Sequence, residues 1–303
     1  MTDAKRSQSV EEDYIGEWGE ETLIRLLLSR KDVAKCVEKL TNTKVGENFI
    51  VKKGSDLNLW KTDAVIITSD NRRIGISLKT FKSGPRSRSD DHLDRRWLDR
   101  PSDKARPWAD VLQMPRDIVE ILRRGILNIA KGDSTQLVPN PQDQQKVREF
   151  FMRAEILRTF LEEAFRNGER DLLILALMEY DSKIRLCLFN MDEVINFIEK
   201  DVSRTGITFR SRINIGNYIQ LQRKGGDGKH VKIRKEDPQH PGNQLQVKLL
   251  SRILMNDVIK ELNSCCFEIE KAVERPPQKT LLNYIWLNYN TFLSCDHRSS
   301  SSV

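Results

Sequence analysis

The sequence predicts an α/β protein, because strand-like and helix-like segments alternate along the chain. Residues 61–80 contain two short apolar runs around a polar turn, as expected for two adjacent strands. Residues 171–179 form an apolar run, and a second strand-like run at 183–189 follows it, which predicts a central hairpin extending the sheet. Residues 11–30 and 144–167 instead place apolar side chains at helical spacing, which predicts helices with one buried side.

Further predicted helices and strands account for much of the rest of the sequence. We expect further helices at 32–43, 110–130 (interrupted near Pro115), 191–200, 249–271 and 280–293, and further strands at 48–51, 205–211 and 213–222. The polar loop 136–145 is the best candidate for a boundary. We therefore expect a catalytic core at 11–135, a second part at 144–293 and a disordered tail at 294–303.

Length and composition limit the class of protein. The 303 residues suffice for one large domain or two smaller ones, and 31% charged against 38% hydrophobic residues predicts a soluble chain. The sequence contains no run of about 18 consecutive apolar residues, so we expect no membrane-spanning segment. The first residues lack the apolar region of a secretory signal, so we expect a cytoplasmic protein. The net charge of +7 is compatible with a nucleic acid, with an acidic membrane surface or with neither.

Five cysteines are present, and no two of them form a CxxC pair. None lies beside a histidine at the spacing of metal ligands. We therefore expect no zinc site and no disulfide scaffold, and most of the cysteines are predicted to be reduced packing residues.

The segment 61–80 holds the most informative side chains. Side chains alternate across a strand, so Ser77 and Lys79 share one face of the strand that follows the turn. Asp63 directly precedes the first strand, and strand pairing can bring it close to both. An acid and a lysine in this arrangement suit metal-assisted phosphodiester cleavage. The acid would hold Mg²⁺, and the ammonium would orient water or neutralise developing charge.

These residues resemble a known nuclease signature. The pattern T-D-(x)13-S-L-K is similar to the PD-(D/E)xK motif, with Thr62-Asp63 as the PD pair and Ser77-Leu78-Lys79 as the (D/E)xK element. It departs from the motif at Thr62, which replaces proline, and at Ser77, which replaces the second acid. Some type II restriction endonucleases of this superfamily show the same S-x-K variant and take a carboxylate from elsewhere. At the level of motifs the resemblance covers residues 15–80.

The resemblance implies a restriction-endonuclease-like core, a central mixed β-sheet flanked by helices, with additional helical and β-hairpin elements. It also implies Mg²⁺ as cofactor, double-stranded DNA as substrate, a homodimer and a cognate DNA methyltransferase in the same restriction-modification system. Asp63, Ser77 and Lys79 would be catalytic.

The second metal ligand is left open by this motif. Many nucleases of the superfamily bring an acid from the first helix into the site, and Glu20 points toward the apolar side of helix 11–30. We expect Glu20 to be catalytic and to hold the metal with Asp63, although a solvated acidic face would give the same sequence. Four other acids are alternatives for this place: Glu17, Glu21, Asp91 and Asp94.

Two basic segments are candidates for DNA contact. One directly follows the central hairpin at 82–108, and the other lies within a recognition segment at about 205–248 that is rich in amides and glycines. Arginine, lysine, asparagine and glutamine bind phosphates or base edges. The predicted DNA-binding residues are Arg86, Arg88, Arg95, Arg96, Arg223, Lys224, Lys229, Asn243, Gln244 and Gln246. Alternatively, the first segment is a solvated loop paired with its own acids, and the second is an exposed hairpin.

Three functions remain open at this point. The leading hypothesis is a sequence-specific, Mg²⁺-dependent endonuclease for double-stranded DNA. A non-catalytic DNA-binding protein on a degenerate nuclease fold would also explain the loss of the acid at Ser77. A structure-specific DNA repair nuclease is the third. The lack of an aromatic RNA-binding pattern argues against an RNA-binding protein.

Overall fold

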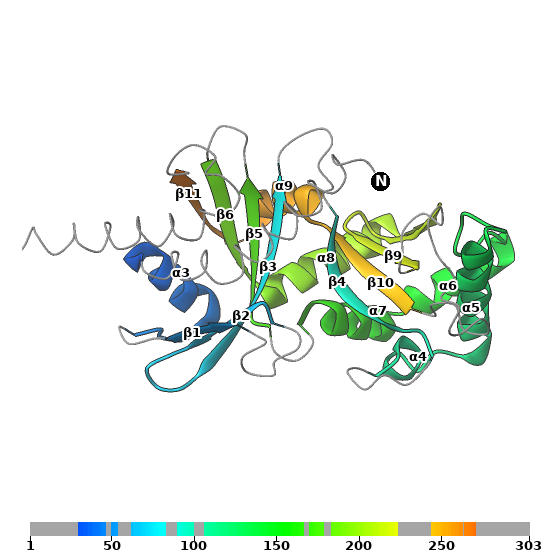
Figure 1. Ribbon diagram of the computed structural model, residues 1–303, viewed down its shortest axis with the longest axis horizontal. Helices are drawn as coiled ribbons and strands as arrows, with labels where there is room; N and C mark the ends of the chain where they lie inside the picture. Colours follow the sequence, from blue (N-terminus) through cyan, green and yellow to red (C-terminus); the bar gives the residue numbers. More distant parts are fainter. Residues whose placement is uncertain are drawn as a thin grey trace, which may run out of the picture.

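A computed structural model describes residues 30–46, 50–53, 62–82, 90–99, 106–166, 170–178, 183–223, 244–262 and 264–270. Within these residues the chain forms two β-sheets with helices packed beside them (Figure 1). The larger sheet has the strand order β1 (Ile50–Lys53), β2 (Ala64–Ile67), β3 (Arg73–Lys82), β5 (Leu172–Met178), β6 (Lys183–Asn190) and β11 (Ser264–Glu270). The smaller sheet has the order β4 (Asp90–Trp97), β10 (Gln244–Leu250), β9 (Ile219–Arg223), β8 (Ile213–Ile215) and β7 (Ile207–Phe209).

The larger sheet is mixed. Strands β1, β2 and β3 form an antiparallel meander, β3 pairs with β5 in parallel, and β5, β6 and β11 are again antiparallel. A parallel pair needs a crossover connection, and here the crossover contains β4 and a group of helices. The predicted α/β class, with a mixed central sheet and flanking helices, is confirmed. The smaller sheet is antiparallel throughout.

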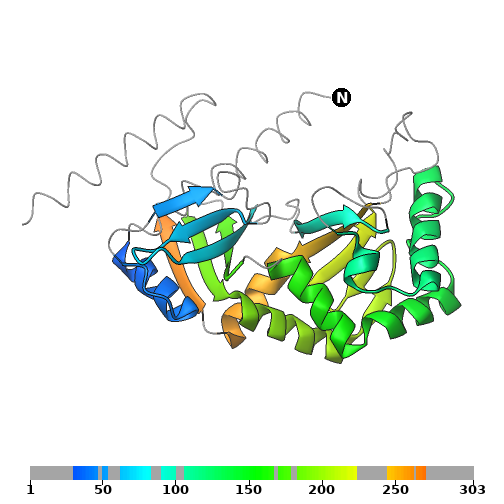
Figure 2. The ribbon, with the colours of Figure 1, turned by 90° about the horizontal axis from the view of Figure 1, so that it is seen from below.

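Helices cover the larger sheet on both faces. The described helices are α3 (Lys31–Thr41), α4 (Trp108–Val111), α5 (Arg116–Lys131), α6 (Pro141–Phe151), α7 (Ala154–Leu161), the π-helical turn η3 (Glu162–Arg166), α8 (Met191–Thr205) and α9 (Ser251–Glu261). Helix α3 packs its apolar side on one face, against Ile76 of β3 and Ile174 of β5 among others. On the other face, Leu173 and Leu175 join the large core with α7 and α8. Figure 2 shows the green and yellow-green helices running along one side of both sheets.

The predicted loop at 136–145 does not separate the two sheets, and its residues from Pro141 onward form the start of α6. Strand β3 precedes this loop and pairs with β5, which follows it, and β4 likewise pairs with β10. The parts of the chain before and after the loop therefore contribute strands to both sheets.

Several predicted elements differ in the structure. The strand-like segment 213–222 is divided into β8 and β9, which pair with each other. The helix expected at 249–271 ends at Glu261, and 264–270 form strand β11, because paired residues there complete the sheet beside β6. The helix expected at 144–167 is divided into α6, α7 and η3. The segment 82–108 contains strand β4, which the smaller sheet pairs with β10.

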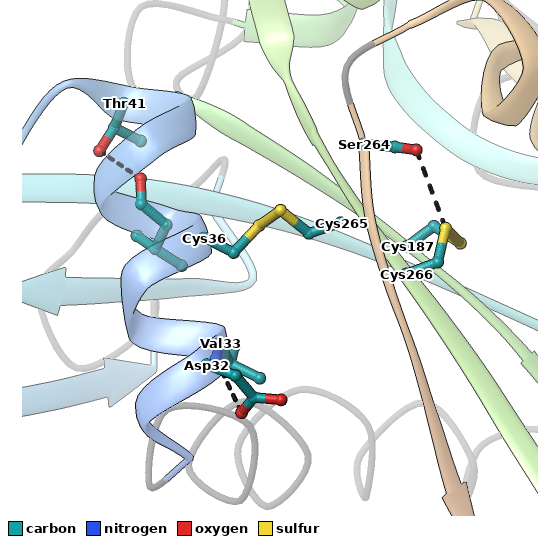
Figure 3. The surroundings of a disulfide bond; sticks show 9 residues. Asp32, Val33, Cys36, Thr41, Cys187, Ser264, Cys265 and Cys266 are labelled. Carbon is teal, nitrogen blue, oxygen red and sulfur yellow. Dashed lines mark hydrogen bonds between the residues drawn. A yellow bond between two sulfur atoms is a disulfide. The ribbon is translucent and has the colours of Figure 1, made fainter.

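The expectation of reduced cysteines is wrong for four of the five, because two disulfides join them (Figure 3). Cys265 and Cys266 are neighbours on β11, so their side chains point to opposite faces. Cys265 bonds Cys36 of α3, and Cys266 bonds Cys187, its cross-strand partner on β6. The bonded residues lie 229 and 79 positions apart, so sequence spacing gave no sign of either pair.

No helix in the described part of the chain combines the length and the hydropathy of a membrane-spanning segment.

Candidate active site

The β2–β3 hairpin forms as predicted and positions three polar side chains. The turn between the strands contains Asn71, whose φ of 62° is tolerated by asparagine better than by most residues. The backbone N–H of Asp63 donates to the carbonyl of Ile76 at 2.9 Å, which extends the pairing one residue beyond β2. Asp63 therefore lies opposite Ser77, and both point to the face that carries Lys79.

Three donors converge on one oxygen of the Asp63 carboxylate. The hydroxyl of Ser77 donates to Oδ2 at 3.2 Å, and the backbone N–H of Leu78 donates to the same atom at 2.6 Å. The ammonium Nζ of Lys79 lies 3.6 Å from it. The structure thus brings together the three predicted catalytic residues of the hairpin and fixes the orientation of the carboxylate.

The site is partly shielded from water. Ser77 is 1% exposed, and the side chains of Lys79 and Asp63 are 11% and 21% exposed. Charges in such a place interact more strongly than on an open surface, because less water screens them. Water and a small substrate group can still reach Asp63. The arrangement can therefore act on a charged substrate.

Packing on both faces of the sheet supports the hairpin. On one face, Ile74, Ile76 and Leu78 are buried against α3. On the other, Ser77 and Lys79 lie in register with Leu173 and Leu175 of β5, which belong to the large core. The position of the site is therefore set by apolar packing on both sides of β3.

A further acid lies beside this site that the sequence reasoning did not single out. Asp171 precedes β5, and its Oδ2 accepts a hydrogen bond from the N–H of Gly75 at 2.7 Å. The N–H of Asp171 in turn donates to the carbonyl of Gly75. Burial raises the pKa of the Asp171 carboxyl above its usual range. The sequence signal that could have identified Asp171 is a charged residue directly before an apolar strand.

The oxygen donors at Asp63 suit a hard cation. Magnesium binds through one or two carboxylates and keeps several waters, and it also takes phosphate oxygens of the substrate. Asp63 Oδ1 and the hydroxyl of Ser77 are donors of this chemical type. No group of three or more histidine, cysteine or acidic side chains that could hold a metal occurs among the residues that the structure describes. The hairpin thus fits Mg²⁺ as a sparse site with one carboxylate.

Of the acids considered for the second ligand, only Asp94 has a described side chain. Its two carboxylate oxygens accept hydrogen bonds from Arg96 at 3.0 and 2.7 Å, so Asp94 is already engaged. The backbone of Asp91 lies in β4, and its side chain is outside the described set. Glu17, Glu20 and Glu21 lie outside the described residues.

Arg96, a predicted DNA contact, lies in the core. Its side chain is 2% exposed, forms ion pairs with Asp94 and Glu163, and stacks over the ring of Trp108 at 4.2 Å. Burial lowers the pKa of Arg96, but the hydrogen bonds and charges of the two carboxylates outweigh it, and the net pKa is raised. Side chains alternate between the two faces along β4, so the adjacent Arg95 is exposed on the opposite face.

Arg223, at the end of β9, is also buried. Its Nε and one Nη atom have no hydrogen-bond partner among the residues that the structure describes, and burial lowers its pKa. Gln244 and Gln246 lie on β10 on the same face as Arg95. Five further predicted contacts lie outside the described residues: Arg86, Arg88, Lys224, Lys229 and Asn243.

Comparison with solved structures finds a likeness to the restriction endonuclease MspI, in a crystal structure of that enzyme with its cognate DNA. The TM-score is 0.46 at 14% sequence identity, over 79% of this chain and 88% of that chain. No protein-family model matches the sequence, and no curated protein matches it.

Proposed function

We propose that the protein is a sequence-specific endonuclease that hydrolyses double-stranded DNA with Mg²⁺, as type II restriction enzymes do. The observation that carries this proposal is the convergence of Ser77, the Leu78 N–H and Lys79 on one carboxylate oxygen of Asp63. The arrangement agrees with the resemblance of residues 62–79 to the PD-(D/E)xK signature.

Each residue of the hairpin has a distinct role in this proposal. Asp63 would hold the metal, which when bound would polarise the phosphoryl group and lower the pKa of water. Lys79 carries a fixed positive charge next to this position, where it orients the attacking water and stabilises the extra negative charge of the transition state. Ser77 keeps Asp63 in one orientation through its hydrogen bond. Glu20 remains the proposed second acid.

The proposal has consequences for partners and location. A homodimer would match the two-fold symmetry of a palindromic site. A cognate methyltransferase would protect the same sequence in the host, and the enzyme would work in the cytoplasm. Arg86, Arg88, Lys224, Lys229 and Asn243 remain proposed DNA contacts.

A second candidate is a DNA-binding protein that no longer cuts. It is favoured by one observation, which is that a buried serine occupies the place of an acid. Ser77 donates to Asp63 where an acid would add a second negative charge. This candidate predicts binding of DNA without cleavage.

A plasmid digest separates the two candidates. Purified full-length protein is incubated with a mixed-sequence plasmid in Mg²⁺ or in EDTA. Discrete bands that require Mg²⁺ are expected from a sequence-specific nuclease. A retarded but intact plasmid would identify the binding protein instead, and cuts at branched or mismatched DNA alone would identify a repair nuclease.

Matched variants assign the activity to the hairpin. Asp63→Asn and Lys79→Ala are expected to lose cleavage by at least about 100-fold, since each removes a charge that the transition state uses. Asp133→Asn and Lys131→Ala change exposed residues at the end of α5, outside the hairpin, and should cut normally. Undiminished cutting by both hairpin variants would refute the assignment.

A further inference from the structure

The outward face of the smaller sheet carries a row of amide side chains. Side chains alternate along its strands, so one face buries Ile219, Leu221, Leu245, Val247 and others in the large core. The opposite face, here named the amide face, includes Arg95, Trp97, Thr208, Asn214, Gln220, Gln222, Gln244, Gln246 and Lys248. Of these, Arg95 and Thr208 are exposed, Gln222 is buried, and the others are intermediate.

Strand register aligns these residues. Gln246 lies between Arg95 on β4 and Gln222 on β9. Two strand spacings of about 4.8 Å make this row about 10 Å long, which fits a DNA major groove about 12 Å wide. In a second row, Gln220 lies between Lys248 and Asn214, and Asn214 faces Thr208.

Hydrogen bonds fix the orientation of the amides. Gln222 donates to the carbonyl oxygen of Gln246 at 3.0 Å, and Gln220 donates to that of Asn214 at 3.0 Å. Arg212, in the turn between β7 and β8, donates to the side-chain carbonyl oxygen of Gln220. Asn214 donates to the hydroxyl of Thr208 at 3.3 Å. Side chains held in this way lose little conformational entropy when they bind a partner.

The charge of the face favours a polyanion. Its two rows include the cations Arg95 and Lys248 but no aspartate or glutamate, and Asp90, in register with Leu250, lies beyond them at the start of β4. The two rows therefore present a net positive charge to phosphate groups. A protein partner fits less well, because the cores of protein interfaces are enriched in aromatic side chains. A single-stranded RNA partner would need several aromatic platforms for its bases. The two rows contain none, and among the described side chains of this face only Trp97, beside Gln244, is a large aromatic.

We propose that the amide face reads base edges in the major groove of duplex DNA and so sets the sequence preference. This inference rests on the proposed function, since it assumes a DNA substrate. Asparagine and glutamine bind the N6 and N7 edge of adenine, and arginine binds guanine or phosphate. Gln246 and Gln220 therefore contact adenines of the recognised sequence, and Arg95 contacts an adjoining guanine or phosphate. Gln222 is buried and holds Gln246 in place through its hydrogen bond.

The test is selection of bound sequences from a library of random duplexes. Full-length protein is mixed with the library in EDTA, and bound duplexes are sequenced. Wild-type protein should enrich one motif. Gln246→Met and Gln220→Met keep side-chain length but remove the amide, so each should lose about 10- to 100-fold of its preference at one or two base pairs. Affinity for an unrelated duplex should change less than about twofold, because phosphate contacts dominate that affinity.

Control variants distinguish this role from damage to the fold. Gln142→Met alters an exposed glutamine on α6 and should select the wild-type motif. Arg95→Ala alters the most exposed member of the first row and provides a second variant if Gln246→Met does not fold. It should weaken preference or affinity without a loss of thermal stability.

Three outcomes overturn the inference. If the variants on the amide face select the same motif as wild type, these residues do not read bases, although a plasmid cut into discrete bands would still support the proposed function. If wild-type protein binds duplexes but enriches no motif, the face has no role in specificity. If it binds no duplex, the inference fails, and the plasmid digest in Mg²⁺ decides whether the proposed function fails with it.

Discussion

Arg95 and Arg96 are neighbours in sequence, yet the structure predicts opposite effects for their substitution. Arg96 contacts the carboxylates of Asp94 and Glu163 and the ring of Trp108. Its side chain is 2% exposed and that of Asp94 is 8% exposed, so Arg96→Leu leaves a buried carboxylate without its cation. Arg95 is exposed on the other face of the strand.

The size of the effect follows from these contacts. Removing one partner of a buried ion pair costs about 3–5 kcal/mol. The loss of the cation–π contact adds about 0.5–2 kcal/mol, while the leucine regains part of the apolar burial. Glu163 is more exposed than Asp94, so water screens its charge, and the loss of its ion pair with Arg96 costs less. We expect a net cost of about 3–5 kcal/mol, which is a large share of the 5–15 kcal/mol that typically stabilises a domain.

Urea unfolding followed by tryptophan fluorescence measures this loss. Arg95→Leu should change the free energy of unfolding by no more than about 0.5 kcal/mol, as is usual for exposed sites, but should weaken DNA binding. The double variant Arg96→Leu/Asp94→Val should be more stable than Arg96→Leu alone, because it removes the stranded carboxylate. An Arg96→Leu protein within about 1 kcal/mol of wild type, or no recovery in the double variant, would refute the reasoning.

Four other predictions concern stability. Gly125→Ala should destabilise by about 1–3 kcal/mol in urea unfolding despite the helix preference of alanine, because the new methyl group would overlap the carbonyl of Leu137; an unchanged midpoint would contradict this. Reduction of the two disulfides with a dithiol should lower stability by about 2–4 kcal/mol, and an unaltered melting temperature in reductant would show that they contribute nothing. Burial raises the folded-state pKa of Asp171 above its unfolded value, so the native state retains a proton that the unfolded chain releases, and stability falls as pH rises through and above the usual aspartate range. Asp171→Asn should remove this fall in melting scans between about pH 3 and pH 7, and an identical pH profile in wild type and variant would exclude it. Ser77→Asp should melt at a lower temperature than wild type in EDTA and recover in Mg²⁺, whereas a variant insensitive to Mg²⁺ would argue against a metal at Asp63.

The sequence was most informative where the relevant contacts are local. The hairpin 61–80 could be predicted because a turn and period-two alternation determine which side chains share a face. Asp63, Ser77 and Lys79 are separated by a single turn, so their approach follows from antiparallel pairing alone. The helix break near Pro115 follows equally from one residue, since proline has no N–H to donate within a helix, and Pro115 directly precedes Arg116, the first residue of α5.

Features that depend on distant pairing could not be predicted in this way. Strand β4 lies in a polar, charged segment that resembles a loop, and it becomes a strand because β10, more than 140 residues later, pairs with it. Burial of Arg96 depends on Glu163 and Trp108, which come from other elements. Both disulfides join β11 to residues far away in sequence. Local composition carries no information on such partners.

The serine at position 77 has a physical consequence for the site before any metal binds. With Ser77, the hairpin holds one negative charge on Asp63 and one positive charge on Lys79, and the hydroxyl donates to the carboxylate. An acid at the same buried position would place two like charges side by side, which raises the energy of the folded state unless a cation neutralises them. Serine therefore allows the hairpin to fold in its final geometry without metal, at the expense of one ligand. A weaker metal site in a well-ordered hairpin is the expected result. Its natural complement to Asp63 is a carboxylate from another part of the chain or a phosphate oxygen of the substrate.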